Sequence, residues 1–380
     1  QRFVREYGVL AGIDPDLRLE TDFALLPLAY RTVAASPTLA AAGAEHAQSL
    51  RDSVSWMRAL DAECAEHAVD PQKLLDTERQ RLDAFTRLRD EGLKVTSEVA
   101  NWEHAVRTRI AFARLVEEFR AAKLDAGVMD FGDLMRFSHA IATGGGQAVD
   151  AMRSAYRAVL LDEYQDTSVV QRTLLQALFG DGHHVLSVGD PKQSIYGFRG
   201  AAAANITDFR NHFPSRDGGP APDYALSVNF RSGAAIVEVA NASAAAGRAA
   251  RMVGGPAATL RVGRTDITAS VHARCYLSVE QERDAVVADV LAELDAGCPP
   301  DEVIVLARSN DEVADYASAL AAAGVPVLSS AGDGLLDAPE VADLLAELSV
   351  LVDPGANEDV MRLLLGRRAP VDPTQAAEQP

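Results

Sequence analysis

The stretch AVLLDEYQDTS, residues 158–168, decides the fold of this chain. An apolar run ends abruptly in a cluster of acid and amide side chains, namely Asp162, Glu163, Gln165 and Asp166. A short apolar run of this kind predicts a buried strand that ends at the edge of a sheet. Like charges side by side are unfavourable unless a positive charge lies among them. The cluster therefore indicates a divalent-cation site, with a solvated acidic turn as the alternative.

The rest of the chain after about residue 126 alternates between short apolar runs and helical patterns. The first round predicts strands at 158–163, 184–190 and 224–230 and helices at 168–180, 204–213 and 234–246. A second round predicts strands at 273–278, 301–310 and 325–330 and helices at 278–297 and 311–324. This rhythm is typical of an α/β fold with parallel sheets covered by helices on both faces. In such sheets ligands bind beyond the carboxyl ends of the strands.

The residues before this region predict a mainly helical domain. Over 14–125, apolar side chains recur at steps of three and four residues, as on one face of a helix. We therefore divide the chain into 1–125, 126–262 and 263–380, with a frayed polar tail at 369–380. The opening residues read as the middle of a helix, so we expect the chain to begin inside a larger protein.

The composition narrows the class of protein. The net charge of −19 argues against non-specific nucleic-acid binding over the whole surface, although a local basic groove remains possible. The three cysteines are far apart and form neither a metal spacing nor a disulfide framework, which predicts a cytoplasmic protein. No apolar stretch approaches the length of a membrane span.

Three polar clusters are expected to meet at one sheet edge. In the acidic cluster, Asp162 suits Mg²⁺, mostly through water, and Glu163 suits activation of the water that attacks a terminal phosphate. In GDPKQSIYGFRGA, residues 189–201, Gln193 can bind a phosphate or the attacking water, and Arg199 can pair with Glu163 or with phosphate. In NFRS, residues 229–232, Arg231 can reach a γ-phosphate.

The aromatic residues of these clusters have two readings. Tyr196 and Phe198 can stack on bases, or one of them can pack beneath its loop. Phe230 can stack on an adenine.

Taken in order and spacing, DEYQDT, GDPKQSIYGFRGA and VNFRS closely resemble motifs II, III and IV of superfamily 1A DNA helicases, of the UvrD/Rep/PcrA and RecB-like type. The resemblance implies RecA-like P-loop NTPase motor domains with a helical insertion. It implies ATP and Mg²⁺ as cofactors and 3′-to-5′ movement on single-stranded DNA and at duplex junctions, in repair or recombination. A nuclease domain or a partner helicase subunit would be a possible companion.

The resemblance also assigns roles to residues. Asp162 takes the Mg²⁺ role, and the catalytic set is Asp162, Glu163, Gln193 and Arg231. The nucleotide-binding set is Phe230, Arg199 and Gln165, and the DNA-stacking pair is Tyr196 and Phe198.

One departure from the family pattern matters. The 380 residues contain no glycine-rich loop ending in Gly-Lys-Ser or Gly-Lys-Thr, since TGGGQ (143–147) lacks the lysine and the hydroxyl. We therefore expect the chain to be an internal piece of a motor and to be inactive alone. The alternative is a non-catalytic DNA-binding or assembly subunit of a helicase–nuclease complex. An unrelated phosphohydrolase would need a phosphate loop or a histidine cluster, and the adjacent His183 and His184 make a poor metal pair.

Overall fold

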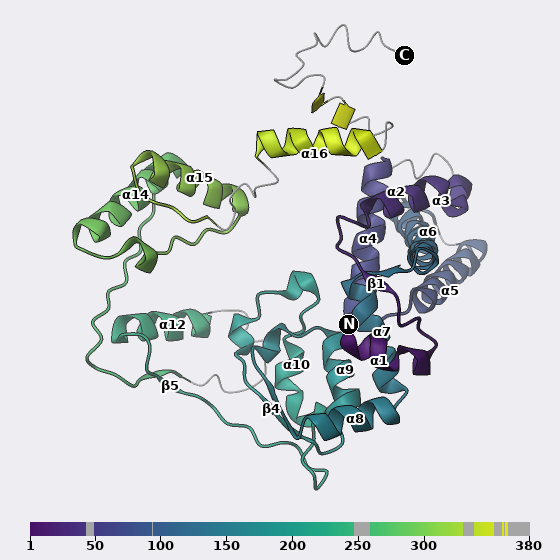
Figure 1. The fold of residues 1–380 in the computed structure, drawn as a ribbon, viewed down its shortest axis with the longest axis horizontal. Helices are drawn as coiled ribbons and strands as arrows, with labels where there is room; N and C mark the ends of the chain where they lie inside the picture. Colours follow the sequence, from purple (N-terminus) through teal and green to yellow (C-terminus); the bar gives the residue numbers. More distant parts are fainter. Residues whose placement is uncertain are drawn as a thin grey trace. The chain divides into compact units, whose positions relative to one another are not determined.

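The computed structural model describes residues 1–42, 49–92, 94–246, 259–329, 338–352, 359–360 and 362–363. The chain divides into two compact units, Gln1–Val271 and His272–Pro380. Their helices and strands are labelled in Figure 1. The polar tail expected at 369–380 and the end of the strand expected at 325–330 lie outside the described residues.

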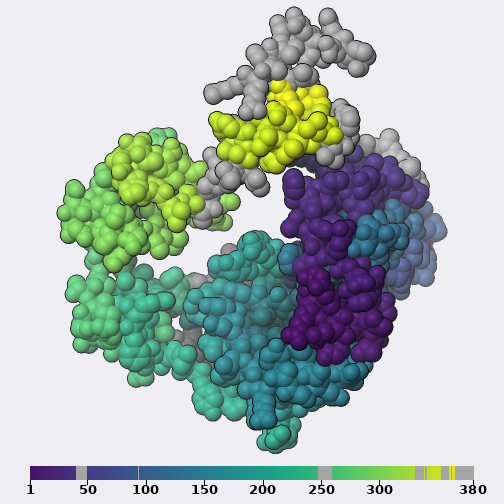
Figure 2. All heavy atoms as spheres, in the orientation of Figure 1, coloured from purple at the N-terminus to yellow at the C-terminus, as the bar shows by residue number. Residues whose placement is uncertain are grey.

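The helical region expected over 14–125 is confirmed, apart from the two-residue strand β1 (Arg18–Leu19). Its helices are α2 (Leu26–Ala35), α3 (Pro37–Ala42), α4 (Leu50–Glu66), α5 (Pro71–Asp90) and α6 (Ser97–Asp125). The side chains of Ser49, Asp70 and Thr96 accept backbone N–H groups at the starts of α4, α5 and α6, which satisfies donors that a helix leaves unpaired. The space-filling view shows these helices packed as one body (Figure 2).

The core of this helical layer is a cluster of apolar side chains from α2, α4 and α6. Met57, Leu115 and Val116 are fully buried there. The α5–α6 hairpin extends from this core, and the rings of Phe85 and Trp102 pack across it with centroids 5.4 Å apart. Burial of apolar surface is the dominant favourable term in such packing.

A buried ion network ties the helical layer to α7 (Phe131–Thr143). Lys123 of α6 is 1% exposed, and its ammonium lies 3.0 Å from Asp61 of α4, 2.5 Å from Asp130 and 2.7 Å from Asp133. Burial alone would lower the pKa of Lys123, but the three carboxylates outweigh it and hold that pKa above its ordinary value. Asp130 and Asp133 also form the capping box of α7. The same carboxylates therefore begin the helix and neutralise the lysine.

The α/β part of the first unit is built on two parallel strands. β3 (Ala158–Leu161) pairs with β4 (His184–Ser187) in the register Ala158 to His184. The helices around them are α1 (Arg2–Tyr7), α7, α8 (Gln147–Ala155) and α9 (Val169–Phe179), and β2 (Val128–Met129) pairs with β1. Tyr164, Phe209 and Phe213 form the centre of the core beneath β3 and β4. The strands and the helix expected at 158–163, 184–190 and 168–180 are thus confirmed, in shorter form.

The opposite face of these two strands is exposed. Leu160 is 77% exposed and Leu186 is 54% exposed, whereas Val159 and Val185 pack into the core. Side chains alternate across a strand, so each strand sends one apolar set inward and one outward. The expectation of helices over both faces therefore holds for one face of β3 and β4 among the described residues.

The third expected strand does not join this sheet. Within the described residues, β5 (Val228–Asn229) pairs in parallel with β6 (Arg261–Val262) as a separate two-stranded sheet, followed by α12 (Ala234–Ala246). Residues 224–227 lie outside the ladder, although Ser227 O accepts from Arg261 N at 2.7 Å where the pairing begins. The single helix expected at 204–213 is likewise interrupted at Asp208, which separates α10 (Ala204–Thr207) from α11 (Phe209–His212).

The described residues of the second unit confirm the expected helices and form none of the expected strands. Its helices are α14 (Val279–Asp295), α15 (Asn310–Ala322) and α16 (Pro339–Val352). The described residues of 273–278, 303–307 and 325–329 belong to no helix and form no ladder. Their apolar side chains are open to solvent, with Leu277 97%, Leu306 89% and Ile304 77% exposed. A strand needs a hydrogen-bonded neighbour, and the described part of this unit provides none.

Candidate nucleotide and DNA site

The acidic turn, residues 162–166, begins at an irregularity in the β3–β4 ladder. Val188 N–H donates to Leu161 O at 2.8 Å, and Val188 O accepts from Tyr164 N at 3.0 Å. A regular parallel ladder would leave one residue between these two bonds, but here Asp162 and Glu163 both lie between them. The turn is therefore a bulge of one extra residue, a feature that re-aims side chains beside active sites.

The bulge places Glu163 in a left-handed backbone conformation. Its φ is 48° and its ψ is 40°, which is uncommon for a residue other than glycine. Asp162 Oδ1 accepts the Glu163 N–H at 3.0 Å, and Glu163 O accepts from Asp166 N at 2.9 Å. These bonds hold the strained turn, and both carboxylates of the Asp162–Glu163 pair are exposed at the strand end.

Gln165 is the buried centre of the turn. It is 1% exposed, and its Nε2 donates to Glu163 Oε2 at 2.8 Å. Its Oε1 accepts from the backbone N–H of Asp190 at 3.0 Å, at the end of the neighbouring strand. A Cβ on Gly189 would overlap this Oε1, so a larger residue there would displace the amide of Gln165. The amide of Gln165 thus joins the two strand ends.

The aromatic loop, residues 190–202, is attached at its start to the acidic turn and at its end to the two residues that follow the turn. At its start, Ser194 Oγ donates to Gln165 O at 3.2 Å. At its end, Ala202 N donates to Thr167 O at 3.0 Å, and Ser168 forms an antiparallel bridge with Ala201. The buried Asn205 donates to Thr167 O at 2.8 Å and reinforces this attachment.

The middle of the aromatic loop is exposed. Phe198 is 74% exposed and Tyr196 is 38% exposed, and their ring centroids lie 6.1 Å apart. The guanidinium of Arg199 lies 5.5 Å from each ring centroid. Gly200 follows with φ 79°, and its α-carbon lies against the side chain of Glu66 at the end of α4. The loop therefore presents two aromatic faces beside a cation.

Gln193 and Asp190 shape the start of the loop. Asp190 accepts from Lys192 N at 2.9 Å and from Gln193 Nε2 at 3.0 Å. The amide of Gln193 is exposed and lies on the same turn that Gln165 holds. Sequence reasoning missed Asp190, Ser194 and Gly189. For Gly189 and Asp190 the sequence did offer a signal, because this Gly-Asp pair ends the apolar run at 184–190.

Phe230 and Arg231 are carried by the other sheet. Phe230 is 63% exposed, and its ring lies over Gly263 after β6. Asn229 Oδ1 accepts from Arg231 N at 3.0 Å and from Ser232 N at 2.7 Å, which turns the chain into α12. The structure thus brings together Asp162, Glu163, Gln165, Gln193, Tyr196, Phe198 and Arg199, and it places Phe230 and Arg231 on β5–β6.

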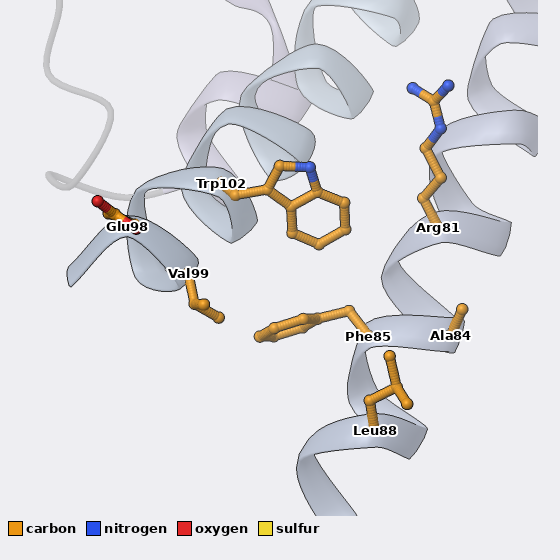
Figure 3. Close-up of a pocket in the computed structure, with 7 residues that line it drawn as sticks. All are labelled: Arg81, Ala84, Phe85, Leu88, Glu98, Val99 and Trp102. Atoms are coloured by element: carbon orange, nitrogen blue, oxygen red, sulfur yellow. The ribbon is translucent and has the colours of Figure 1, made fainter. Parts of the chain in front are cut away.

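An apolar pocket between α5 and α6 is separate from these elements (Figure 3). Phe85, Leu88, Val99 and Trp102 line it, with Arg81, Ala84 and Glu98. The contact between Trp102 and Phe85 makes Trp102 part of the packing between these two helices.

The described residues hold no group of three or more His, Cys, Asp or Glu side chains arranged for a metal. All three cysteines are free thiols. No described helix is both long enough and apolar enough to cross a membrane. A cation at Asp162 would thus depend on water or phosphate for most of its ligands, which is how Mg²⁺ is usually bound beside nucleotides.

Comparison with known proteins decides the family. Residues 23–214 match the family described as UvrD/REP helicase N-terminal domain. The chain belongs to the UvrD/REP helicase family. The match includes α2 to α11 and therefore both the acidic turn and the aromatic loop.

Individual UvrD-type relatives give the same result. The chain is 31% identical over 260 residues to the ATP-dependent DNA helicase UvrD2 of Mycobacterium tuberculosis, covering 67% of this chain and 36% of that protein. It is 29% identical over 305 residues to UvrD1 of Mycobacterium leprae, covering 75% and 37%. It is 27% identical over 280 residues to DNA helicase II of Escherichia coli, covering 72% and 36%. The aligned part of the chain thus spans little more than a third of each relative.

Proposed function

We propose that this chain is part of an ATP-dependent DNA helicase or translocase that couples ATP hydrolysis to 3′-to-5′ movement on single-stranded DNA. The observation that carries the proposal is the direct attachment of the aromatic loop to the acidic turn. One hydrogen-bonded element presents carboxylates at one end and base-sized aromatic faces at the other. A nucleotide-driven motor needs that combination, whereas a simple phosphatase has no use for the exposed rings.

At the nucleotide, the proposed roles follow the chemistry of the exposed groups. Asp162 would hold Mg²⁺, whose charge neutralises phosphate oxygens, and Glu163 would orient and deprotonate the attacking water. Adjacent exposed carboxylate oxygens fit that ion, since Mg²⁺ prefers oxygen ligands and keeps several waters. Gln193 would contact the terminal phosphate or the water from the start of the aromatic loop.

Phe230 and Arg231 are proposed to reach the same nucleotide from the β5–β6 sheet, with Phe230 on the adenine and Arg231 on the phosphate. Their exposure supports availability for a ligand. Arg199 is proposed to contact phosphate when DNA is bound. Its guanidinium lies over the rings of Tyr196 and Phe198, and a base that stacks on these rings would displace it.

For the architecture we propose RecA-like motor domains with a helical insertion. Residues 1–125 form the end of a first-motor segment and the insertion, 126–262 the later part of the first motor, and 263–380 the start of the second. The two compact units meet after Val271, which supports the proposed boundary between residues 262 and 263. Parallel sheets are usually covered on both faces, so the exposed apolar face of β3 and β4 supports a further part of the parent protein packing against it.

The proposed setting is cytoplasmic DNA repair or recombination, with single-stranded DNA and duplex junctions as substrates. A nuclease domain or a partner helicase subunit is a possible companion. The names of the relatives, which are DNA helicases, support the DNA substrate.

The test is ATP hydrolysis by the full-length parent with and without single-stranded DNA, together with unwinding of a duplex that has a 3′ tail. We expect DNA-stimulated turnover and unwinding. The 380-residue chain should hydrolyse ATP negligibly, because it lacks the phosphate loop that supplies much of the charge stabilisation. A parent that binds DNA without any turnover would favour the second candidate, a non-catalytic subunit, for which the missing phosphate loop is the one supporting observation.

A further inference from the structure

We propose that Gln165 is a positioning residue that holds Glu163 in register with the aromatic loop, and does not itself contact the nucleotide. The inference rests on the proposed function. It replaces the expectation that Gln165 binds the nucleotide directly.

The first observation is how the amide of Gln165 is used. Its Nε2 donates to Glu163 Oε2 at 2.8 Å and approaches Asp166 Oδ2 at 3.4 Å, while its Oε1 accepts from Asp190 N at 3.0 Å. Its backbone carbonyl accepts from Ser194 Oγ. A side chain that is 1% exposed with both ends of its amide occupied is poorly placed to bind a ligand in the open turn.

The second observation is the conformation of Glu163. Its left-handed backbone leaves the side chain exposed on a bulge, where apolar packing does not select a rotamer. Among the described residues, the hydrogen bond from Gln165 is therefore the contact that restrains the carboxylate itself. A general base must lie within hydrogen-bond reach of the proton that it removes, so a small displacement lowers the rate of the chemical step.

The third observation is that the other end of the amide is attached to the aromatic loop. Asp190 begins that loop, and its N–H is held by Gln165 Oε1. Ser194, two residues before Tyr196, is held by the carbonyl of the same Gln165. A movement of the loop on DNA would therefore reach Glu163 through one side chain and one backbone carbonyl.

The experiment uses the full-length parent with Gln165→Met, which keeps the side-chain volume and removes every amide hydrogen bond. The matched control is Gln171→Met, because Gln171 also uses its amide oxygen for a buried backbone N–H, that of Ser168, and has no bond to Glu163. For each protein the measurements are MgADP affinity and stoichiometry, kcat and KM for ATP with and without single-stranded DNA, and the melting midpoint.

We expect Gln165→Met to lower DNA-stimulated kcat by roughly ten- to a hundredfold, as for partners that orient an active-site ligand. MgADP affinity and the KM for ATP should stay within about twofold, with one MgADP bound per protein, because the amide makes no nucleotide contact. Gln171→Met should keep the kcat of wild type even if its melting midpoint falls as far as that of Gln165→Met. Normal kcat in Gln165→Met, or a loss confined to KM and MgADP affinity, would overturn the inference.

If Gln165→Met does not fold, Gln165→Asn gives the same test, since its amide is one methylene too short to join Glu163 and Asp190. It should show the same kcat loss, and full activity would refute positioning. A wild-type parent without ATP turnover would defeat the proposed function and this inference together. A wild-type parent that turns over beside a fully active Gln165 variant would defeat the inference alone.

Discussion

The backbone N–H of Tyr164 donates to Val188 O at 3.0 Å, one residue later than a regular parallel ladder would place that bond. The extra residue is Glu163, in the left-handed conformation. The strand end thus carries two exposed carboxylates above a fully buried tyrosine. This displacement, rather than the acidic sequence alone, exposes the Asp162–Glu163 pair.

Glu163→Gln in the full-length parent should lower ATP turnover by about 10²–10⁴-fold, because the change keeps the side-chain shape and removes the base. MgATP binding should persist, and the melting midpoint should not fall, since one of three neighbouring carboxylates loses its charge. Single-turnover hydrolysis beside equilibrium MgATP binding checks both parts. Turnover within a few-fold of wild type would exclude Glu163 as the base.

Gly189→Ala should destabilise the first unit by about 1–3 kcal/mol, because the new methyl group would overlap Gln165 Oε1 and lie 2.7 Å from Ile206 Cδ1. Gly197→Ala is the control, since nothing lies within 4 Å of the Cβ it would add. That control should stay within about 0.5 kcal/mol. Urea unfolding of the two variants gives the comparison, and equal stabilities would contradict the tight contact between the strand ends.

Phe198→Ala in the parent should weaken single-stranded DNA binding by about 10–100-fold, because base stacking is worth roughly 1–3 kcal/mol. The melting midpoint should hardly change, since Phe198 is 74% exposed. Phe23→Ala is the control, at an 80% exposed phenylalanine outside the loop. DNA titrations and melting curves separate the alternatives, and normal affinity with a lowered midpoint would assign Phe198 to packing.

Lys123→Met should destabilise the first unit by about 3–5 kcal/mol, because it leaves Asp61, Asp130 and Asp133 buried without their shared cation. Lys73→Met, at an exposed position of α5, should cost no more than about 0.5 kcal/mol. Far-ultraviolet circular dichroism against urea measures both. A Lys123 variant as stable as the Lys73 variant would show that the network makes no net contribution.

Tyr164→Phe should stabilise the first unit by about 1 kcal/mol, because among the described residues the buried hydroxyl has no hydrogen-bond partner. A variant less stable than wild type would instead indicate a bridging water.

The same variant should also change the alkaline limit of stability. Burial raises the pKa of Tyr164 to about 12 from an ordinary value of 10.0, so the folded state keeps a proton that the unfolded state loses. Titration of this hydroxyl therefore leaves the stability unchanged below about pH 10 and lowers it as the pH rises from 10 to about 12. Unfolding free energies at pH 9 and pH 11 should fall less in the phenylalanine variant, and an equal fall would refute this assignment.

Much of the first unit could be predicted from local patterns. The apolar runs at 158–161 and 184–187 predict β3 and β4, because a short apolar run is a local signal for a strand and does not depend on the rest of the fold. The helical spacing over 97–125 predicts α6 for the same reason. The sequence also indicates an aromatic loop after the second strand, and Phe198 is 74% exposed there. Base stacking by this loop stays a prediction.

The pairing of distant strands could not be predicted in this way. The run at 224–230 carries a strand pattern, but only two of its residues form β5, with β6 as the partner instead of the β3–β4 sheet. The runs near 303–307 and 325–329 carry the same pattern and remain unpaired. A strand pattern records apolar content, whereas a ladder also needs a neighbour in register.

The sequence by itself determined the identity of the chemical groups, namely carboxylates after one strand, an amide and aromatic rings after the next, and the helical character of residues before 126. Only the tertiary structure decided how they meet. It inserted Glu163 into a bulge, buried Gln165 between two strand ends, and attached the aromatic loop to residues 165–168. These outcomes depend on which backbone groups find partners across the fold, and residue patterns along the chain record burial but not the choice of hydrogen-bond partner.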